Sequence, residues 1–524
     1  MTKHFIPRNI IFITIIIFTH WYPLQKLEVA YDFSIVIEPL LKINSVSEYL
    51  KMLFTLKTVD IRPITDISYF FDSMFYSKLH YKIFLISNLF YWLIIINIFH
   101  FLLEKIKPSA EGLNFYLSLI LLTHPMLSYV TPWIVSRKHI LSLLFILIYF
   151  ISFLKIKENI ELNNCSGDHV RNSLKQQIIA FLSYTLSVFS QPISALSPIP
   201  TLIYIYLYDH HKKYRFFIVM IISMISFSLL LNYYYFSFVA PQTISMTKFT
   251  GTLDLHGRLM GIGRVFFQIL LPFNNSFFYD EINYYHLIGL LLGILSLFFF
   301  YKKIPVKIFL CWTGIFFSPL VILYAKSTNI FFFNTYALLP LVCFIILFNQ
   351  VDLKFTTAIK GIFIFCFLFN TIFLFKTNKI WQKNDQFLKY SYDQDNCCFN
   401  SIYYADNLWS KDNIQKDTID EAIRISKEVI SKQCFLSGEE FYAQAIKILT
   451  MSILYNNDKK ISSDNKIKVI SNLPISSITK KILIYAIKAR DGDSFSFSEM
   501  KKLISANSVE PTQYDLILKY VENK

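Results

Sequence analysis

The chain has 524 residues, of which 54% are hydrophobic and only 17% are charged, and it includes 53 phenylalanines and 33 tyrosines. A soluble globular protein carries roughly a quarter charged residues, so this composition argues against a soluble protein and favours one that crosses a membrane many times. The formal net charge of +15 fits basic loops that face anionic lipid, and because the chain lacks a motif for reading bases we expect no nucleic-acid partner.

The first apolar run follows Lys3 and Arg8 and ends near Trp21. Because Tyr22 and Pro23 come next, in place of the small residues of a cleavage site, we interpret this run as an uncleaved membrane span. Later runs are also long enough to span a bilayer when tilt is allowed. The predicted spans, about eleven in all, are 9–21, 82–103, 113–130, 138–155, 176–191, 194–208, 216–238, 286–301, 305–324, 331–349 and 356–376.

The lysines and arginines between these runs predict the orientation, because cytoplasmic loops carry an excess of both. If the N-terminus is cytoplasmic, every inner connection is basic, whereas the short outer connections hold little beyond Lys326 and the Arg137–Lys138 pair. The inner basic residues are Lys105, Lys107, Lys155, Lys157, Arg171, Lys175, Lys212, Lys213, Arg215, Lys302, Lys303, Lys307, Lys354 and Lys360. We therefore expect an integral protein of a bacterial cytoplasmic membrane with its N-terminus inside.

An odd number of spans places the region after Lys376 outside the cytoplasm, and its composition there turns polar. Asp417 to Ser431 and Glu439 to Leu454 carry apolar residues at helical spacing, and such paired helices indicate a small helical-repeat domain. The fold class expected is therefore all-α, a polytopic helical membrane protein with a soluble helical domain. The predicted parts are a transmembrane domain over 1–376, its outer loops 22–81 and 241–285, and an extracytoplasmic domain over 377–524.

The seven cysteines show no spacing typical of metal ligands, so we expect no metal site. Cys397, Cys398 and Cys434 follow the last predicted span. If this region is extracytoplasmic, Cys434 can form a disulfide with one of the adjacent two cysteines. Free thiols in a reducing setting are the other possibility, and the sequence leaves both open.

The stretch from His124 to Leu141 lies between two apolar runs and brings a histidine, a tryptophan and an arginine to the predicted outer surface. An arginine that opens a span at this surface runs against the usual charge bias, so we expect an anionic group to face Arg137. His124 is a candidate site residue or, since Pro125 follows it, a helix-terminal cap. Trp133 is a candidate site residue or an aromatic anchor at the membrane interface.

Acidic residues in the first outer loop are candidates for the chemistry. Asp32 is flanked by aromatic and aliphatic residues, a setting that raises the pKa of a carboxyl group and suits it to act as a general base. Asp60, Asp66 and Asp72 are either part of the same site or solvated surface residues.

The second outer loop contains Arg258 and Arg264 within a glycine-rich sequence, followed by an apolar piece that is too short to span. We expect this piece to be re-entrant or interfacial. A guanidinium matches phosphate oxygens with two parallel hydrogen bonds, so both arginines are candidates to bind a lipid phosphate. Simple extension of the two side chains toward the headgroups is the alternative.

Several of these residues resemble a known family. His124-Pro125, followed by Trp133-Ile134 and Arg137, is similar to the His-Pro…Trp-Ile-x-x-Arg signature of the membrane-embedded O-mannosyltransferase-like proteins with tetratricopeptide repeats, which belong to the GT-C class of glycosyltransferases. The other similar stretches, in the family's order, are Tyr31-Asp32 to Pro39, Arg62-Pro63-Ile64-Thr65, Ser190-Gln191-Pro192 to Pro198, Leu271-Pro272 to Tyr279, Asn378 to Leu388, and Asn407-Leu408 with Asp420 to Ile423.

This resemblance implies a polyprenyl-phosphate-linked sugar as donor, an acceptor outside the membrane, and C-terminal repeats that hold the acceptor or a partner protein. It also implies an outer-loop aspartate as the base. We assign this role to Asp32, the role of a cation on the phosphate side to Arg137, and supporting polar roles to Arg62 and His124. Chemically, a base removes a proton from the acceptor hydroxyl while a cation stabilises the departing phosphate.

The chain also departs from the family's pattern. Phe33 replaces the second acidic residue after Asp32, which argues against a metal site built from paired carboxylates. In the second span Asn88 is kept, but Leu85 and Trp92 stand at the family's histidine positions. The alternative function is a non-catalytic membrane scaffold or assembly factor whose helical domain binds a partner protein.

Overall fold

The computed structural model describes most of the chain as helices. The described residues are 5–27, 37–43, 45, 47–49, 51, 62–76, 80–162, 167–199, 201–202, 205, 215–234, 255–271, 284–326, 337–352, 356–394, 398–409, 416–431, 448, 463–471, 477–506 and 521. Every regular element within them is helical, so the expected all-α class is confirmed for this part of the chain. The chain forms two compact units, 1–390 and 391–524. The boundary expected at 376 lies inside helix α19 (Thr357–Asn378).

Four helical segments among the described residues are long and apolar enough to cross a membrane, namely Lys82–Ile106, Ile134–Glu158, Tyr284–Lys303 and Thr357–Gln382. Shorter apolar segments are Ile6–Thr19, Ile218–Phe227, Val306–Ser318 and Leu338–Gln350. Large apolar side chains point outward on the long segments, as with Leu295 at 64% exposure and Phe365 at 69%. Such surfaces are stable in hydrocarbon and not in water, which supports membrane association. The finer count of about eleven spans stays a prediction.

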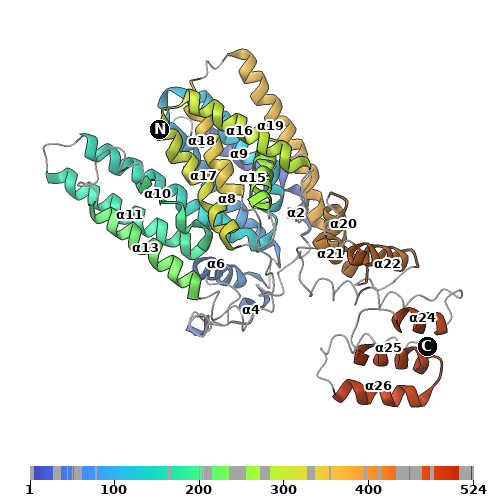
Figure 1. The fold of residues 1–524 in the computed structure, drawn as a ribbon. Coiled ribbons are helices and arrows are strands. Elements are labelled where there is room, and N and C mark those ends of the chain that lie inside the picture. Colours follow the sequence, from blue (N-terminus) through green and yellow to red (C-terminus); the bar gives the residue numbers. More distant parts are fainter. Residues whose placement is uncertain are drawn as a thin grey trace. The chain divides into compact units, whose positions relative to one another are not determined.

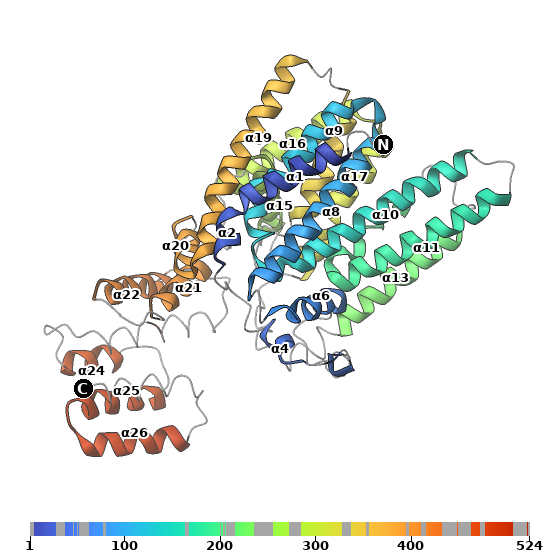
Figure 2. The same cartoon turned by 180° about the vertical axis from the view of Figure 1, so that it is seen from behind.

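The first unit is built around α8 (Lys82–Ile106) and α10 (Arg137–Leu162), which pack against each other. Helix α11 (Gly167–Ser190) lies along α10, and α13 (Arg215–Tyr234) lies beside α11 (Figures 1 and 2). On the other side of α8 are α9 (Glu111–Thr123), α1 (Phe5–Thr19) and α19. The remaining long helices are α16 (Tyr284–Lys303), α17 (Val306–Lys326) and α18 (Leu338–Gln350).

Helix α15 (Leu255–Leu270) packs against α16 in a glycine-lined contact. A Cβ atom on Gly289 would lie 1.9 Å from the carbonyl oxygen of Gly263, and one on Gly263 would lie 2.1 Å from the carbonyl oxygen of His286. The two backbones therefore approach each other so closely that only glycine fits, an arrangement common between membrane helices.

The second unit contains two pairs of neighbouring helices, α21 (Cys398–Trp409) with α22 (Lys416–Ser431), and α25 (Ser477–Arg490) with α26 (Ser494–Ala506). A shorter helix, α24 (Ser463–Ser471), packs against α25. Helix α22 coincides with the amphipathic helix predicted from Asp417 to Ser431. The second predicted helix, Glu439 to Leu454, lies almost wholly outside the described residues, and a repeat architecture stays a prediction.

The turn between α25 and α26 depends on two adjacent residues. Gly492 adopts a φ of 105°, a conformation that ends α25 and that other residues rarely adopt. Asp493 then accepts hydrogen bonds from the backbone N–H groups of Phe495 and Ser496 at 3.1 and 3.3 Å and from the Ser496 hydroxyl at 2.6 Å. Asp493 thus satisfies donors that the first turn of α26 leaves open.

Replacing Asp493 by alanine is expected to loosen the first turn of α26. The hydrogen bonds from Ser496 hold the pKa of Asp493 below its usual 3.8. Since the folded-state pKa is lowered, the stabilisation is present above the unfolded-state pKa and disappears as the pH falls through the folded-state value. We expect faster amide exchange over 494–500 in Asp493→Ala at pH 7 by mass spectrometry, while Asp491→Ala matches the wild type. Equal protection in both variants would contradict the capping role.

Candidate functional site

The connection between α9 and α10 is an irregular segment that lies wholly inside the first unit. It comprises two short 3-10 turns, Pro125–Tyr129 and Ile134–Ser136, and every residue from 124 to 137 is buried. An interrupted helix leaves backbone N–H and C=O groups without partners, and among apolar helices these groups need hydrogen bonds from the protein itself.

Side chains from three distant parts of the chain supply such bonds. They come from α6 (Pro63–Ser73), from α8, and from the turn Lys379–Gln382 that follows α19. The bonds run from Tyr69 OH to Ile134 O at 2.8 Å, from Asn88 Nδ2 to Thr131 O at 3.2 Å, and from Trp381 Nε1 to Ser128 O at 2.6 Å. His20, the residue that follows α1, also contacts the Thr131 hydroxyl through Nε2 at 2.5 Å. The connection is therefore held by at least four separate elements.

His124 begins this connection and uses both ring nitrogens. Its Nδ1 accepts a hydrogen bond from the backbone N–H of Met126 at 3.3 Å, so the ring proton is on Nε2, which donates to the carbonyl oxygen of Ile269 at 3.2 Å. His124 therefore caps the turn that begins at Pro125, which is one of the two roles expected for it. In addition, His124 joins the connection to the end of α15.

Arg137 is fully buried and contacts the chain's own polar groups on several sides. Its Nη2 lies 2.6 Å from Asp72 Oδ2, and its Nε donates to Asn88 Oδ1 at 2.7 Å. Nη2 also donates to the carbonyl oxygen of Phe84 at 2.9 Å, and the guanidinium carbon lies 4.5 Å from the centroid of the Tyr69 ring. The anionic group that we expected to face Arg137 is therefore Asp72.

A second buried ion pair lies at the start of α6. Arg62 Nε is 3.7 Å from Asp66 Oδ1, and the two side chains are 3% and 5% exposed. The Tyr49 hydroxyl donates to Asp66 Oδ2 at 3.3 Å. Burial, followed by the negative charge of Asp66, raises the pKa of Tyr49, so this phenol keeps its proton and remains a donor.

The interpretation of Asp66 and Asp72 as solvated residues is wrong, because both are buried and ion-paired. The sequence contained only part of the signal, the spacing of the polar residues, and not their burial. Polar residues recur on α6 at helical spacing, and one helical face therefore gathers them into a buried stripe. Its members are Thr65, Asp66, Ser68, Tyr69 and Asp72. Asp60 lies outside the described residues.

Segments that resemble the glycosyltransferase family meet around the connection. Thr65 in the Arg-Pro-Ile-Thr stretch donates from Oγ1 to the carbonyl oxygen of Ser190, the first residue of the Ser-Gln-Pro stretch, at 3.1 Å. Trp381 reaches Ser128, as described above. Asn88, kept from the family's second-span motif, hydrogen-bonds to Arg137. The Ser68 hydroxyl links two of these contacts, because it donates to the Thr65 carbonyl oxygen at 2.6 Å and accepts from Arg137 Nη1 at 3.3 Å. Residues far apart in the sequence are thus joined in one polar network around the connection.

The other candidate residues are placed differently. Asp32 lies outside the described residues. Arg258 is exposed on α15, so its side chain can extend toward the lipid headgroups as one of the two alternatives proposed. Arg264 is fully buried, so the same alternative is wrong for Arg264. The guanidinium carbon of Arg264 lies 5.4 Å from the centroid of the Phe267 ring. Trp133 is 4% exposed and packs inside the fold, so it is not an anchor in the membrane interface.

Within the described residues, no group of three or more His, Cys, Asp or Glu side chains is placed to hold a metal ion. Cys311, Cys343 and Cys366 are free thiols. Searches of protein-family models, curated proteins and solved structures found no match to this chain. The similarity to the GT-C class therefore rests on the short stretches quoted above.

Proposed function

We propose that the protein is a membrane glycosyltransferase that moves a sugar from a polyprenyl-phosphate carrier to an acceptor on the extracytoplasmic side. The observation that supports this proposal is the meeting of the family-like stretches in one polar network. The contact of Thr65 with Ser190 and the contact of Trp381 with Ser128 join residues 125 and 253 positions apart in the sequence.

In this proposal Asp32 acts as the base on the acceptor hydroxyl. It precedes α4 (Glu38–Leu41), which packs against α6, the helix that carries the Arg62–Asp66 pair. Asp32 is five positions before Ile37 in the sequence, so the chain between them can span at most about 18 Å. This reach is consistent with a role for Asp32 at the network.

The geometry favours a positioning role for Arg137. Its guanidinium already contacts Asp72, Asn88 and the Phe84 carbonyl, so it fixes α6 against α8 and α10. Arg62 is paired with Asp66 and Arg264 is fully buried. We therefore assign the direct phosphate-side contact to the exposed Arg258 of α15, with Arg62, Arg264 and His124 as supporting polar groups. Cations near the leaving phosphate stabilise the charge that develops on it.

The proposed orientation has the N-terminus in the cytoplasm and the second unit outside. Two ion pairs support the grouping of the basic connections on one side. Lys105 Nζ lies 3.2 Å from Glu158 Oε2, and Lys107 Nζ lies 2.8 Å from Asp352 Oδ1. These pairs join three of the connections predicted to be inner, namely those that follow α8, α10 and α18.

Replacing Asp32 by asparagine in the native host tests the transferase directly. We expect this strain to lose the same glycan from extracytoplasmic proteins or polysaccharides as a full deletion, measured by mass spectrometry, while the protein still accumulates in the membrane. Asparagine keeps the size of the side chain but cannot accept the proton. Glu48→Gln, an exposed change in the same loop, is the control and should retain the glycan.

A scaffold remains the second candidate, and one observation favours it. Both conspicuous arginines face carboxylates of the chain itself, Arg62 with Asp66 and Arg137 with Asp72. Such pairs can serve folding alone. If the deletion has a phenotype that Asp32→Asn lacks, the scaffold function is supported and the assignment of Asp32 as base is wrong.

A further inference from the structure

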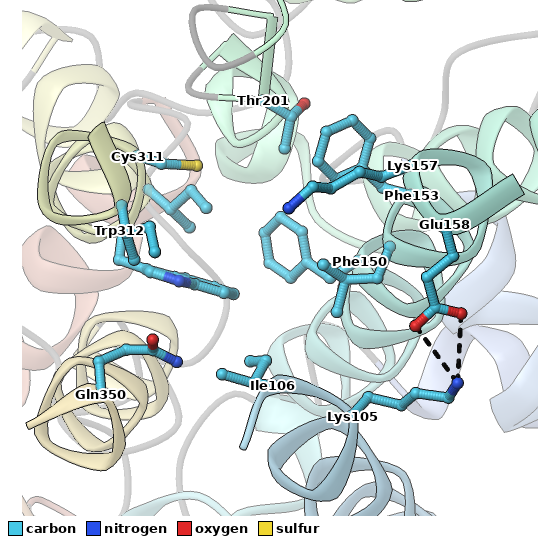
Figure 3. A pocket seen from close by; sticks show the side chains of 13 residues that line it. Lys105, Ile106, Phe150, Phe153, Lys157, Glu158, Thr201, Cys311, Trp312 and Gln350 are labelled. Atoms are coloured by element: carbon cyan, nitrogen blue, oxygen red, sulfur yellow. Dashed lines mark hydrogen bonds and ion pairs between the residues drawn. The ribbon is translucent and has the colours of Figure 1, made fainter. Parts of the chain in front are cut away.

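A half-enclosed cavity of about 210 Å³ lies at the end of α10 that is far from Arg137. Lys157 and Glu158 on α10 line it, and Lys157 is 20 positions after Arg137, which corresponds to about 30 Å along a helix. Other lining residues come from the ends of α8 and α18 and from the first turns of α17 (Figure 3). The cavity is therefore separate from the network around the α9–α10 connection.

The lining combines aromatic walls with a small excess of positive charge. Figure 3 shows the Lys157 ammonium pointing across the cavity toward α17, the helix that carries Cys311 and Trp312. The Phe150 and Trp312 rings pack edge to face, with centroids 5.3 Å apart. Lys105 and Glu158, which form the ion pair described above, lie at one side. Two lysines and one glutamate give the lining a formal charge of +1.

Polar groups opposite the ion pair complete the lining. The Gln350 amide lies across the cavity from Glu158, and Thr201 lines the cavity on the side away from Lys105 (Figure 3). The Thr201 hydroxyl donates to the carbonyl oxygen of Pro198 at 2.6 Å and also contacts the Tyr149 hydroxyl, so its position is fixed. An anion in the cavity can therefore contact an ammonium and an amide while its organic part contacts aromatic rings.

We propose that this cavity binds the phosphate-ester head of an anionic lipid, with the start of its chain against the aromatic walls. Pockets for whole small molecules usually enclose about 300–1,000 Å³, so this smaller, half-enclosed space takes only the head of a longer ligand. The cavity also lies among the basic helix ends that the charge pattern places next to the anionic cytoplasmic leaflet. This inference does not depend on the proposed transferase.

The test uses the purified full-length protein in detergent, titrated with phosphatidylglycerol and examined by native mass spectrometry. We expect Lys157→Gln to weaken the tightest lipid site roughly tenfold, the effect of losing one charge-assisted hydrogen bond. Lys155→Gln, two residues away on the same helix and not part of the lining, should bind as the wild type does. Unchanged binding in Lys157→Gln would overturn the proposal.

Two further measurements distinguish a lipid phosphate from free phosphate and keep the test valid if Lys157→Gln does not fold. Inorganic phosphate at the same concentration as the lipid should not displace it. If phosphate does displace the lipid, the cavity binds a free phosphate anion and the proposal that it binds a lipid is wrong. The fluorescence of Trp312 is the part of the protein's tryptophan emission that is lost in Trp312→Phe. Phosphatidylglycerol with brominated chains should quench this emission, whereas brominated phosphatidylcholine should not. Equal quenching by both lipids, or none by either, would contradict the proposal even if Lys157→Gln does not fold.

Discussion

Replacing Arg137 by glutamine is expected to destabilise the first unit by about 3–5 kcal/mol, the usual effect of removing one partner of a buried ion pair. The change leaves Asp72 as a nearly buried charge without its guanidinium, and it removes the hydrogen bonds to Asn88 and to the Phe84 carbonyl. The Ser87 hydroxyl, which donates to Asp72 Oδ1 at 2.8 Å, cannot neutralise the charge. The midpoint of thermal unfolding in detergent measures the effect.

Two companion variants show whether the unpaired charge is the cause. Lys138→Gln changes the adjacent, less buried basic residue and should leave the midpoint nearly unchanged. Arg137→Gln combined with Asp72→Asn should recover part of the loss, because a neutral amide in place of the carboxylate avoids the buried charge. A double variant no more stable than Arg137→Gln alone would show that the loss arises from the missing hydrogen bonds and packing of Arg137 and not from the unpaired charge of Asp72.

The sequence predicts that the partner of Arg137 is an anion, but it does not identify that anion. An arginine at the predicted outer end of an apolar helix requires an anion, and the sequence permits that inference. It does not say whether the anion is a lipid phosphate or a carboxylate of the same chain. Asp72 is 65 residues away, and only the packing of α6 against α8 and α10 brings it near. The polar stripe on α6 was readable from spacing, but its burial was not.

The all-helical class followed from composition and apolar runs, because hydrocarbon permits spanning segments only with internally satisfied backbones. The contacts that hold the α9–α10 connection could not be anticipated in the same way. Trp381 looked like part of a motif after the last span, yet its indole N–H donates to Ser128 O. Asn378 similarly donates to the carbonyl oxygen of Thr19, 359 residues earlier. Hydropathy identifies helices but does not say which of them are neighbours.

Gly289→Ala is expected to destabilise the first unit by about 1–3 kcal/mol or more, the range for an added group in a packed contact. The new Cβ would lie 1.9 Å from the Gly263 carbonyl oxygen and 2.7 Å from Phe267 Cβ, so α15 and α16 must separate. Gly361→Ala on α19 is the matched control, since a Cβ there meets nothing within 4 Å. Because alanine favours helix over glycine by about 1 kcal/mol, Gly361→Ala should leave the unfolding midpoint unchanged or raise it.

The same variant tests whether α15 and the α9–α10 connection are coupled. Separation of α15 from α16 displaces Ile269, whose carbonyl accepts from His124 Nε2. If that hydrogen bond is lost in Gly289→Ala, then His124→Ala should destabilise the variant less than it destabilises the wild type. The difference between the two losses is the coupling energy. Equal losses in both backgrounds would mean that the hydrogen bond survives, and that the connection adjusts to the movement of α15 without losing its contact.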